Sequence, residues 1–381
     1  MAPALDVLIV GGGPVGAALA ALLAEGRLRT GLIEAREVDA TDPRSIALSY
    51  GSALILQRLG AWTHARACTP IESVHVSQAG GWGRTLITAH EQDVPALGYV
   101  CHYGALHAAL AQPLRAIPQV DVRTGTRAVA LASQTDRVEV ELASAAGAGR
   151  LDARLVVLAD GGQISAGLVD HDDRDYRQCA VIAEVECDLP HAGRAYERFS
   201  PQGPIALLPC GSGYALVWTV VAEVAEPLAA LPDAAFLDAL QRAFGDRAGR
   251  LLRCGPRSVF PLRLRVAHAP RASRVVLLGN AAQTLHPVAG QGLNLGLRDA
   301  QALAALVLAT PDALHDPDLA RRFHAVRRSD RLGTVGITDS LVRLFSNEFA
   351  PLRAVRGCGL TLLDLVPPAK RMFAQRMMFG G

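Results

Sequence analysis

The stretch Asp-Val-Leu-Ile-Val-Gly-Gly-Gly-Pro-Val-Gly at residues 6–16 decides the fold of this 381-residue chain. A short apolar run followed at once by G-x-G-x-x-G predicts a buried parallel strand that turns directly into a helix. Residues 17–25 are rich in alanine and leucine, which favours that helix. A second predicted strand at residues 30–34 ends in Glu34. Strand, glycine turn, helix, strand and acid together make the dinucleotide-binding fingerprint.

Each part of the fingerprint has a physical purpose. Gly11 permits the tight turn, Gly13 lets the backbone approach a pyrophosphate, and Gly16 lets the helix pack closely on the strand. Free N–H groups at the helix start face the phosphates. Glu34 can accept hydrogen bonds from ribose hydroxyls, and its charge disfavours the 2′-phosphate of NADP at this site. The fingerprint alone leaves FAD, NAD and a glycine-rich turn without a ligand as alternatives.

Two later segments have a similar form. Residues 155–161 read as a buried strand that ends in Asp160-Gly161, and residues 275–282 read as another that ends near Asn280. Closely spaced glycines at 290 and 292 precede a helical pattern, which predicts a second helix start directed at an anion or a polarised carbonyl. The alternatives are an ordinary turn for the first segment and a simple helix cap for the second.

Composition excludes several classes of protein. Half the residues are apolar, 19% are charged and the net charge is +2, so neither disorder nor nucleic-acid binding is indicated. Seven cysteines without a C-x-x-C pair predict no disulfide framework, no zinc site and a reduced cytosolic compartment, with most of the thiols buried. The histidines lack ligand spacing, which predicts no metal. Lys370 is the single lysine, which argues against Schiff-base chemistry.

An uncharged run at residues 7–24 has nearly the length of a membrane span. Gly-Gly-Gly-Pro interrupts it where a span would be helical, and Asp6 rather than a basic residue precedes it. We therefore expect neither a span nor a signal peptide here, and we expect a cytoplasmic protein.

Taken together, the three segments resemble those of the flavoprotein aromatic hydroxylases, the family with the p-hydroxybenzoate hydroxylase fold. The run His-Pro-Val-Ala-Gly-Gln-Gly-Leu-Asn-Leu-Gly-Leu-Arg-Asp at 286–299 is similar to the signature of the ubiquinone-biosynthesis branch. Within that branch the resemblance is greatest to the 2-octaprenyl-6-methoxyphenol hydroxylases. Further similar stretches cover nearly the whole chain, at residues 44–48, 59–62, 194–199, 203–209, 216–218, 328–330 and 338–345.

The resemblance implies an α/β fold with a Rossmann-like FAD-binding domain, an inserted antiparallel β-sheet substrate domain and C-terminal helices. Because Gly16 and Gly279 must serve one FAD, the cofactor domain is expected to be discontinuous. The expected division places the FAD-binding domain at 1–72, 97–170 and 266–330, the substrate domain at 73–96 and 171–265, and the C-terminal helical region at 331–381.

The resemblance also implies roles for individual residues in holding FAD. The ADP half is expected at the first glycine turn, the pyrophosphate near Arg44, the ribityl chain at Asn280 and the pyrimidine end beside the second helix start. The Asp160-Gly161 turn is expected to serve both FAD and the reducing nucleotide. The full expected set is Gly11, Gly13, Gly16, Glu34, Arg44, Asp160, Gly161, Asn280, Gly290, Gln291, Gly292, Leu293 and Asn294. Residues 162–167 depart from the wider family pattern, so NADH, NADPH and a reductase partner all stay open.

The implied chemistry belongs to the cofactor. NAD(P)H acts as a transient reductant, O₂ adds at the flavin C4a to give a hydroperoxyflavin, and the terminal oxygen attacks an electron-rich ring. The implied substrate is a 2-polyprenyl-6-methoxyphenol, hydroxylated para to its hydroxyl. His286, beside Pro287, is the acid–base candidate, and its alternative is a histidine that shapes the turn. Leu207, Tyr214 and Trp218 are expected to line the substrate pocket, although Tyr214 and Trp218 suit a packed sheet equally well.

A polyprenyl tail is nearly insoluble, so we expect the substrate to be met at the inner face of a membrane or within a ubiquinone-biosynthesis complex. The mixed apolar and basic stretch at 360–379 suits peripheral contact with anionic lipid, or simple packing on its own domain. Competing functions on the same scaffold are a reductase, a halogenase, a hydroxylase of another ring position or another aromatic compound, and a non-catalytic FAD subunit.

Overall fold

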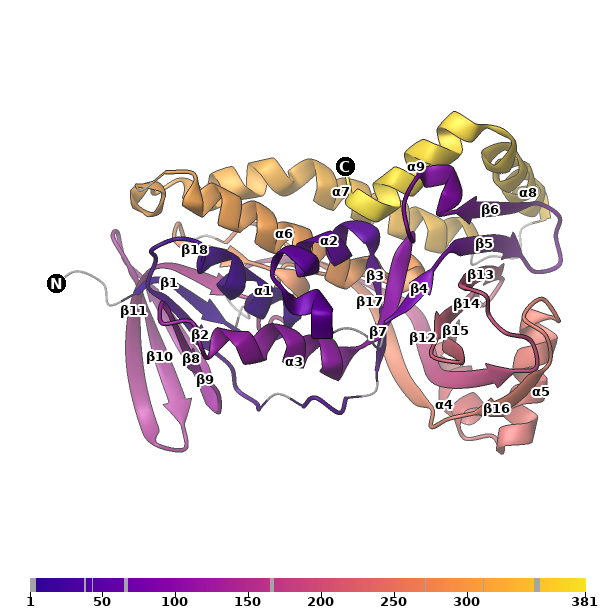
Figure 1. Ribbon diagram of the computed structural model, residues 1–381, viewed down its shortest axis with the longest axis horizontal. Helices are drawn as coiled ribbons and strands as arrows, with labels where there is room; N and C mark the ends of the chain where they lie inside the picture. The colour runs from indigo at the N-terminus through magenta and orange to yellow at the C-terminus, as the bar shows by residue number, and fades with distance from the viewer. Residues whose placement is uncertain are drawn as a thin grey trace.

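The computed structural model describes residues 5–37, 39–42, 44–64, 68–164, 168–270, 272–310, 312–345 and 350–381. A seven-stranded sheet with its helices forms one half of the molecule and a nine-stranded sheet forms the other, while the C-terminal helices lie along one side of both (Figure 1). The seven-stranded sheet has the order β8 (Val120–Arg123), β2 (Thr30–Ile33), β1 (Leu5–Val10), β11 (Gly147–Leu158), β10 (Val138–Ser144) and β9 (Thr126–Ser133), with β18 (Val275–Leu277) also paired to β11.

The opening stretch folds as its pattern predicts. Strand β1 turns through glycines into α1 (Pro14–Leu23), and β2 then pairs with β1 in parallel. The uncharged run at 7–24 is therefore a strand, a turn and a helix. Among the described residues, no helix combines the length and apolar character that crossing a bilayer requires.

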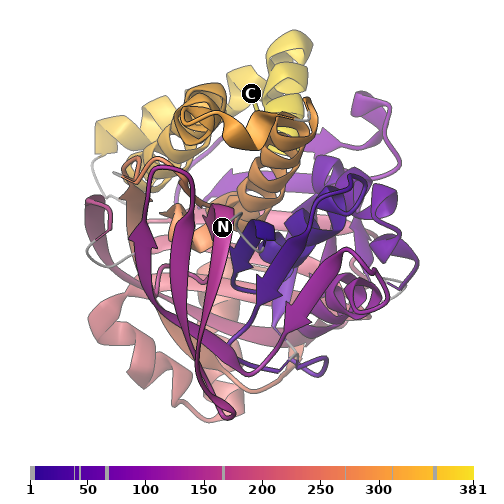
Figure 2. The same ribbon diagram turned by 90° about the vertical axis from the view of Figure 1, so that its left-hand side faces the viewer.

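Three helices cover one face of the seven-stranded sheet. Buried leucines of α1, α3 (Tyr103–Leu114) and α6 (Gln291–Leu308) form a single core with the valines and isoleucines of β1 and β11. On the opposite face, side chains of β9 and β10 form a second core with those of β1, β2, β11 and β18 of the same sheet. Strands β9 and β10 lie nearest to the viewer in Figure 2. Burial on both sides explains why β1 is apolar at nearly every position.

The nine-stranded sheet confirms the inserted sheet domain. Its order is β19 (Gln283–Thr284), β17 (Ser258–Ala267), β12 (His171–Cys187), β15 (Gly213–Val221), β14 (Gly203–Cys210), β13 (Arg194–Ser200), β5 (Ser73–Gln78) and β6 (Arg84–Thr88), with β16 (Leu251–Cys254) paired to β12. All neighbours pair antiparallel except β13 and β5, which are parallel. That exception arises because β5 and β6 come from an earlier segment and join the sheet as a separate hairpin.

Helices lie on both faces of this sheet (Figure 1). Helices α4 (Ala222–Ala229) and α5 (Asp233–Phe244), which the sequence analysis did not predict, cover one face. Helices α7 (Leu319–Phe345), α8 (Ala350–Leu365) and α9 (Pro367–Phe379) contribute to the packing on the other. The structure draws one boundary differently from the expectation, since α7 runs unbroken through residues 330 and 331.

The prediction of unpaired, mostly buried cysteines is wrong. A small sheet of β3 (Ser45–Ser49), β7 (Gly98–His102) and β4 (Thr69–Ile71) pairs residue 69 with residue 100, which places Cys68 opposite Cys101. These two form a disulfide with their Cα atoms 4.4 Å apart. Of the seven cysteines, Cys101 alone is buried. Sequence spacing could not reveal the pair because an antiparallel register, not local spacing, brings it together.

The tight contact between β1 and α1 yields a test. A Cβ atom at Gly16 would overlap the carbonyl oxygen of Gly11, so Gly16→Ala should lower the free energy of unfolding by about 2 kcal/mol and abolish FAD binding. Gly336 lies in α7 with open space around it, so Gly336→Ala should raise stability by about 0.5–1 kcal/mol. Urea unfolding and the flavin absorbance of the purified protein measure both effects. Equal behaviour of the two variants would contradict the packing argument.

Candidate active site

A cavity of about 770 Å³ opens where three parallel strands of the first sheet end. The turns that follow β1, β11 and β18 all line it. Backbone hydrogen bonds hold the strand ends together, from Ala159 N to Val10 O (2.7 Å) and from Leu278 N to Leu158 O (2.8 Å). Segments more than 260 positions apart thus meet at one edge, which is where α/β sheets bind their ligands.

The first glycine turn is open toward this cavity. Gly11 has a φ of +106°, and a Cβ there would come within 2.5 Å of Ala159. Gly13 immediately precedes α1, so the N–H groups of the first helical turn are available to an anion. The turn therefore has the shape and the donors that a pyrophosphate requires.

Glu34 lies at the end of β2 and lines the same cavity. Its Oε2 accepts the N–H of Gly12 (2.6 Å) and its Oε1 accepts the N–H of Arg36 (2.9 Å). Each carboxylate oxygen keeps a lone pair for a ribose hydroxyl. His107, which the sequence analysis missed, donates from Nε2 to Gly12 O (2.7 Å) and braces the turn from α3.

Arg44 lines the cavity together with Tyr103, which gave no sequence signal. Its guanidinium pairs with Asp42 through Nε (3.0 Å) and Nη2 (2.6 Å) and lies 4.6 Å from the centre of the Tyr103 ring. The hydrogen bond to Asp42 raises the pKa of Arg44, so the group stays charged. The cation is therefore held at the cavity wall between a carboxylate and an aromatic face.

The second and third turns use their polar side chains differently. Both oxygens of Asp160 accept backbone N–H groups of its own turn, from Gly162 (2.9 Å) and Ile164 (2.8 Å), which supports the turn-forming alternative for this motif. Gly161 and Asn280 line the cavity, and Asn280 is exposed within it. Residues 165–167 of the departing segment lie outside the described residues.

The second helix start divides its residues between the cavity and the protein interior. Gly292 and Leu293 line the cavity. Gln291, by contrast, donates to Met377 O in α9 (3.2 Å). Gly290 precedes α6 with a φ of +59°, the left-handed conformation that favours glycine.

Asn294 ties this loop to β3 and does not face the cavity. Its Oδ1 accepts the N–H of Ser49 (2.8 Å), and its Nδ2 donates to Ala47 O (3.1 Å) and Gly290 O (2.7 Å). The side chain is almost fully buried. Asn294 is therefore a positioning residue that holds the loop at the start of α6.

His286 is fully buried, and its Nδ1 accepts the N–H of Val288 (3.1 Å). Burial lowers the pKa of His286 to about 4, which keeps the ring neutral at pH 7. Pro287 follows at the start of the short 3₁₀ turn Val288–Gly290. These facts favour the turn-shaping alternative over an acid–base role for His286.

The expected substrate-pocket residues lie on the wrong face of the nine-stranded sheet. Leu207, Tyr214 and Trp218 are buried in the core that α4 and α5 form with this sheet. Trp218, for example, packs with its ring centre 5.8 Å from that of Phe236 in α5. The expectation that these three line a pocket is wrong because large apolar side chains filled the helix-covered face.

The alternate residues of the same strands make the other face. Ile182, Ala206, Leu208 and Val217 are each half-buried, and the register places Ile182, Val217 and Ala206 side by side across β12, β15 and β14. Cys210 continues this face and meets Ser45 of β3, with Sγ 3.6 Å from Oγ. This partly open apolar face is therefore turned toward the first half of the molecule.

Glu197 is a buried acid that the sequence analysis missed. It lies on β13 two residues before Phe199, so the two side chains share a face of the strand. The ring of Phe199 stacks on that of Phe345 of α7, with the ring centres 3.9 Å apart. Although part of the side chain is accessible, Oε1 is enclosed and has no hydrogen-bond partner among the described residues. Burial raises the pKa of Glu197 to about 8.

One trio within the described residues has metal-ligand types close together. Atoms of His102, Glu184 and Cys210 all lie within 4.8 Å of one another. His102 Nδ1 is paired with Glu184 Oε1 at 3.8 Å, and Cys210 contacts Ser45. The expectation of no metal site stays a prediction.

Comparison with known proteins gives one family and several relatives. A family model described as an FAD binding domain matches residues 4–328. The ubiquinone hydroxylase UbiL of Rhodospirillum rubrum is 36% identical, over 98% of this chain and 89% of that protein. The 3-demethoxyubiquinol 3-hydroxylase of Escherichia coli is 31% identical, over 96% of each chain.

Solved structures agree on the fold. The crystal structure of p-nitrophenol 4-monooxygenase PnpA from Pseudomonas putida DLL-E4 superposes with a TM-score of 0.80 at 20% identity. The match covers 100% of this chain and 99% of that one. PqsL from Pseudomonas aeruginosa superposes with a TM-score of 0.75 at 24% identity, over 93% and 99% of the two chains.

The role of Asn294 is testable by stability. Asn294→Asp keeps an acceptor for Ser49 but places a carboxylate against two carbonyl oxygens, and Asn294→Ala removes all three bonds. We expect each to lower the free energy of unfolding by about 2–3 kcal/mol. The exposed Asn280, changed to alanine, should shift it by less than about 0.5 kcal/mol. Urea unfolding of the FAD-free protein measures these changes. An Asn294→Asp variant as stable as the wild type would show that Asn294 does not hold the loop to β3.

Glu197 should make stability depend on pH. Because its folded pKa of about 8 lies above the ordinary value of 4.5, the folded state binds more protons than the unfolded state between these limits. The contribution of Glu197 to the free energy of unfolding is therefore fully present below pH 4.5, and it is lost as the pH rises to about 8. Glu197→Gln should flatten that slope in thermal unfolding scans. An unchanged slope would show that the carboxyl is not protonated at neutral pH.

Proposed function

The chain belongs to the FAD binding domain family, and from that premise we propose that it is a monooxygenase that hydroxylates a polyprenylated phenol in ubiquinone biosynthesis. The specific proposed substrate is a 2-polyprenyl-6-methoxyphenol, attacked para to its hydroxyl. Relatives named as ubiquinone hydroxylases, at 31–36% identity over almost the whole chain, support the pathway.

The cavity fits FAD on the evidence of its own residues. Cβ atoms added at Gly161 and Gly292 would stand in open space, and one added at Gly13 would meet only the Tyr103 hydroxyl at 3.6 Å. The first glycine turn would hold the pyrophosphate, Glu34 the ribose, and the start of α6 the pyrimidine end. When bound, FAD supplies the electron transfer and oxygen activation that no side chain can perform. The N-terminus of α6 would stabilise negative charge at that end.

The apolar face of the nine-stranded sheet is the observation that carries the substrate class. Ile182, Ala206, Leu208 and Val217 offer hydrocarbon to whatever lies between the two halves. Glu197 pairs with Ala206 on the same face, and burial raises the pKa of Glu197 to about 8, which favours its uncharged form at neutral pH. Such a surface desolvates an aromatic ring and excludes water from the reacting centre. It therefore suits a prenylated phenol better than a small ionised aromatic acid.

The structure also bears on a competing function. A halogenase of this scaffold needs a lysine at the site, and the only lysine of the chain is Lys370. Its Nζ donates to Glu91 (2.9 Å) and to Leu86 O (3.1 Å) at the edge of the nine-stranded sheet. The described lining of the cavity contains no lysine, which disfavours that alternative.

We place the encounter with substrate at the inner face of a membrane. Helices α8 and α9 pack on β6 and α2 (Tyr50–Arg58), yet Leu362, Leu365 and Met372 are 63–72% exposed on them. Exposed apolar side chains on terminal helices suit contact with a lipid surface. Electrons come from NADH, NADPH or a partner reductase.

Activity of the FAD-loaded protein tests the proposal. A short-chain 2-prenyl-6-methoxyphenol should stimulate NADH or NADPH oxidation and gain one oxygen atom from ¹⁸O₂, detected by mass spectrometry, with a supplied reductase as a second arm. Val217→Phe should lower kcat/KM about tenfold with normal FAD content, because the added bulk fills the substrate face. Val326→Phe, on the exposed side of α7, should leave it unchanged.

Cells that lack each ring hydroxylase in turn supply the complementary test. Restoration of ubiquinone in the strain that accumulates the 2-polyprenyl-6-methoxyphenol supports the proposed ring position. Restoration only in another strain assigns a different carbon. Failure in every strain, with no oxygen incorporation in vitro, would leave the non-catalytic FAD subunit as the better description.

A further inference from the structure

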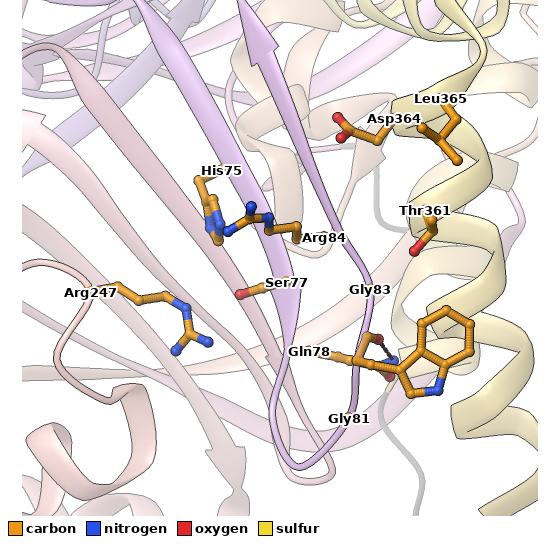
Figure 3. A pocket seen from close by; sticks show the side chains of 11 residues that line it. His75, Ser77, Gln78, Gly81, Gly83, Arg84, Arg247, Thr361, Asp364 and Leu365 are labelled. Carbon is orange, nitrogen blue, oxygen red and sulfur yellow. Dashed lines mark hydrogen bonds between the residues drawn. The ribbon is translucent and has the colours of Figure 1, made fainter.

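A second cavity, of about 390 Å³, lies at the edge of the nine-stranded sheet, away from the FAD site. It is bounded by β5, β6, α8 and Arg247 from the loop after α5, and a smaller hollow of about 280 Å³ shares its His75, Arg84 and Asp364. Figure 3 shows Arg84 beside the His75 ring, with Arg247 reaching toward Ser77 from the other side. Neither the fold nor the proposed reaction requires this cavity.

Strand register brings several arginines to this cavity. Ser77 of β5 pairs with Arg84 of β6 on one side and with Arg198 of β13 on the other, and Arg194 lies two residues before Tyr196 on the same face. Tyr196 in turn donates its hydroxyl to the carbonyl of Arg247 (2.9 Å), which holds that loop against the sheet. Four guanidinium groups therefore lie near His75 and Ser77. Arg84 and Arg247 line the cavity, Arg194 lines the smaller hollow beside it, and Arg198 reaches Ser77 from β13.

These four cations have no carboxylate partner among the described residues. Arg198 donates weakly to Ser77 Oγ (3.5 Å) and Gln78 O (3.3 Å), and Arg194 donates to Ser73 Oγ (3.5 Å). Asp364 is the one acid in the described part of the lining. It already accepts the N–H of Leu86 (3.0 Å) and lies 3.5 Å from Lys370 Nζ. The cavity therefore has a net excess of positive charge.

Buried polar atoms in the same place are left without partners. His75 Nδ1 and Arg198 Nε are both enclosed and make no hydrogen bond in the described part of the chain. Burial, followed by the charges of Arg247, Arg84 and Arg194, lowers the pKa of His75, so its ring stays neutral and keeps one N–H to donate. Like charges and unpaired buried donors both destabilise a protein unless an anion neutralises them.

We propose that this cavity binds a phosphate group, carried by a soluble phosphate ester or by a phospholipid head group. Guanidinium groups match phosphate oxygens with two parallel hydrogen bonds each, and the Ser77 hydroxyl adds a donor. Trp82 and Leu365, 56% and 72% exposed, stand at the mouth and offer apolar surface to the rest of the molecule.

The site is distinct from the catalytic one. Arg194, Tyr196 and Arg198 alternate with Glu197 on β13, so the arginines lie on the face of the sheet opposite to the half-buried apolar row. The bound phosphate is therefore neither the substrate nor the electron donor of the proposed reaction. Binding here anchors or regulates the protein, and its test does not depend on turnover.

Calorimetry on the FAD-saturated protein with inorganic diphosphate tests the site, since bound FAD closes the other anion site. Diphosphate should bind and raise Tm, and Arg84→Gln and Arg247→Gln should each weaken binding about tenfold or more. Both arginines are exposed, so these variants should fold. Arg253→Gln, at an exposed arginine of β16, is the matched control and should bind normally. No binding to the wild type, or equal binding by all variants, overturns the proposal.

Two further ligands distinguish the sources of the phosphate. ADP represents a soluble phosphate ester. Vesicles of phosphatidylcholine with about 30% phosphatidylglycerol, an anionic lipid, represent a phospholipid head group. The ligand, ADP or the vesicles, whose binding is lost in Arg247→Gln but kept in Arg253→Gln identifies which kind of molecule carries the phosphate. If neither ligand is sensitive to Arg247, the cavity is not a phosphate site.

Discussion

The parallel pairing of β11 between β1 and β18 is the interaction on which the rest of the structure depends. Leu158 pairs with Val10 on one side and Leu277 on the other, so three strands end at the same level. Whatever follows them, at residues 11, 159 and 278, must turn at one edge. The glycine turn, the Asp160 turn and the Asn280 turn therefore surround a single cavity, although one belongs to the first residues of the chain and another to its last third.

A second constraint is the pleat of the nine-stranded sheet, which separates two kinds of surface by a single residue. Trp218 and Leu207 face the helices α4 and α5, while Val217 and Leu208 face the FAD-binding half. The same alternation on β13 places Glu197 on one face and the arginines of the second cavity on the other. A side chain's position in the strand thus decides which of the two surfaces of the sheet it belongs to.

A buried ion-pair network connects α6 to the C-terminal helix α7. Asp299 of α6 is paired with Arg327 (2.6 Å) and Arg331 (3.2 Å) of α7, and Asp330 of α7 is paired with Arg298 (2.9 Å) of α6. Removal of Asp330 would leave the buried Arg298 without a carboxylate partner among the described residues. The Arg-Asp pair that ends the long motif is therefore structural, and it holds α6 in the place from which Gly292 and Leu293 line the cavity.

The sequence by itself determined the glycine turn and the strand–turn–helix start of the α/β fold, because the fingerprint at residues 6–34 is local and each of its glycines meets a local steric requirement. The choice of FAD over NAD came from the resemblance of all three segments to one family, not from the fingerprint. The sequence also placed Glu34, Arg44 and Asn280 at the cavity. Only the tertiary structure decided that Asn294 clamps β3, that His286 is sealed inside a turn and that Tyr214 belongs to the core. Those roles depend on which face of a strand or helix is covered, and the covering helices α4, α5 and α7 come from elsewhere in the chain. Cys68 and Cys101 show the same limit, since a register between strands, not a motif, joins them.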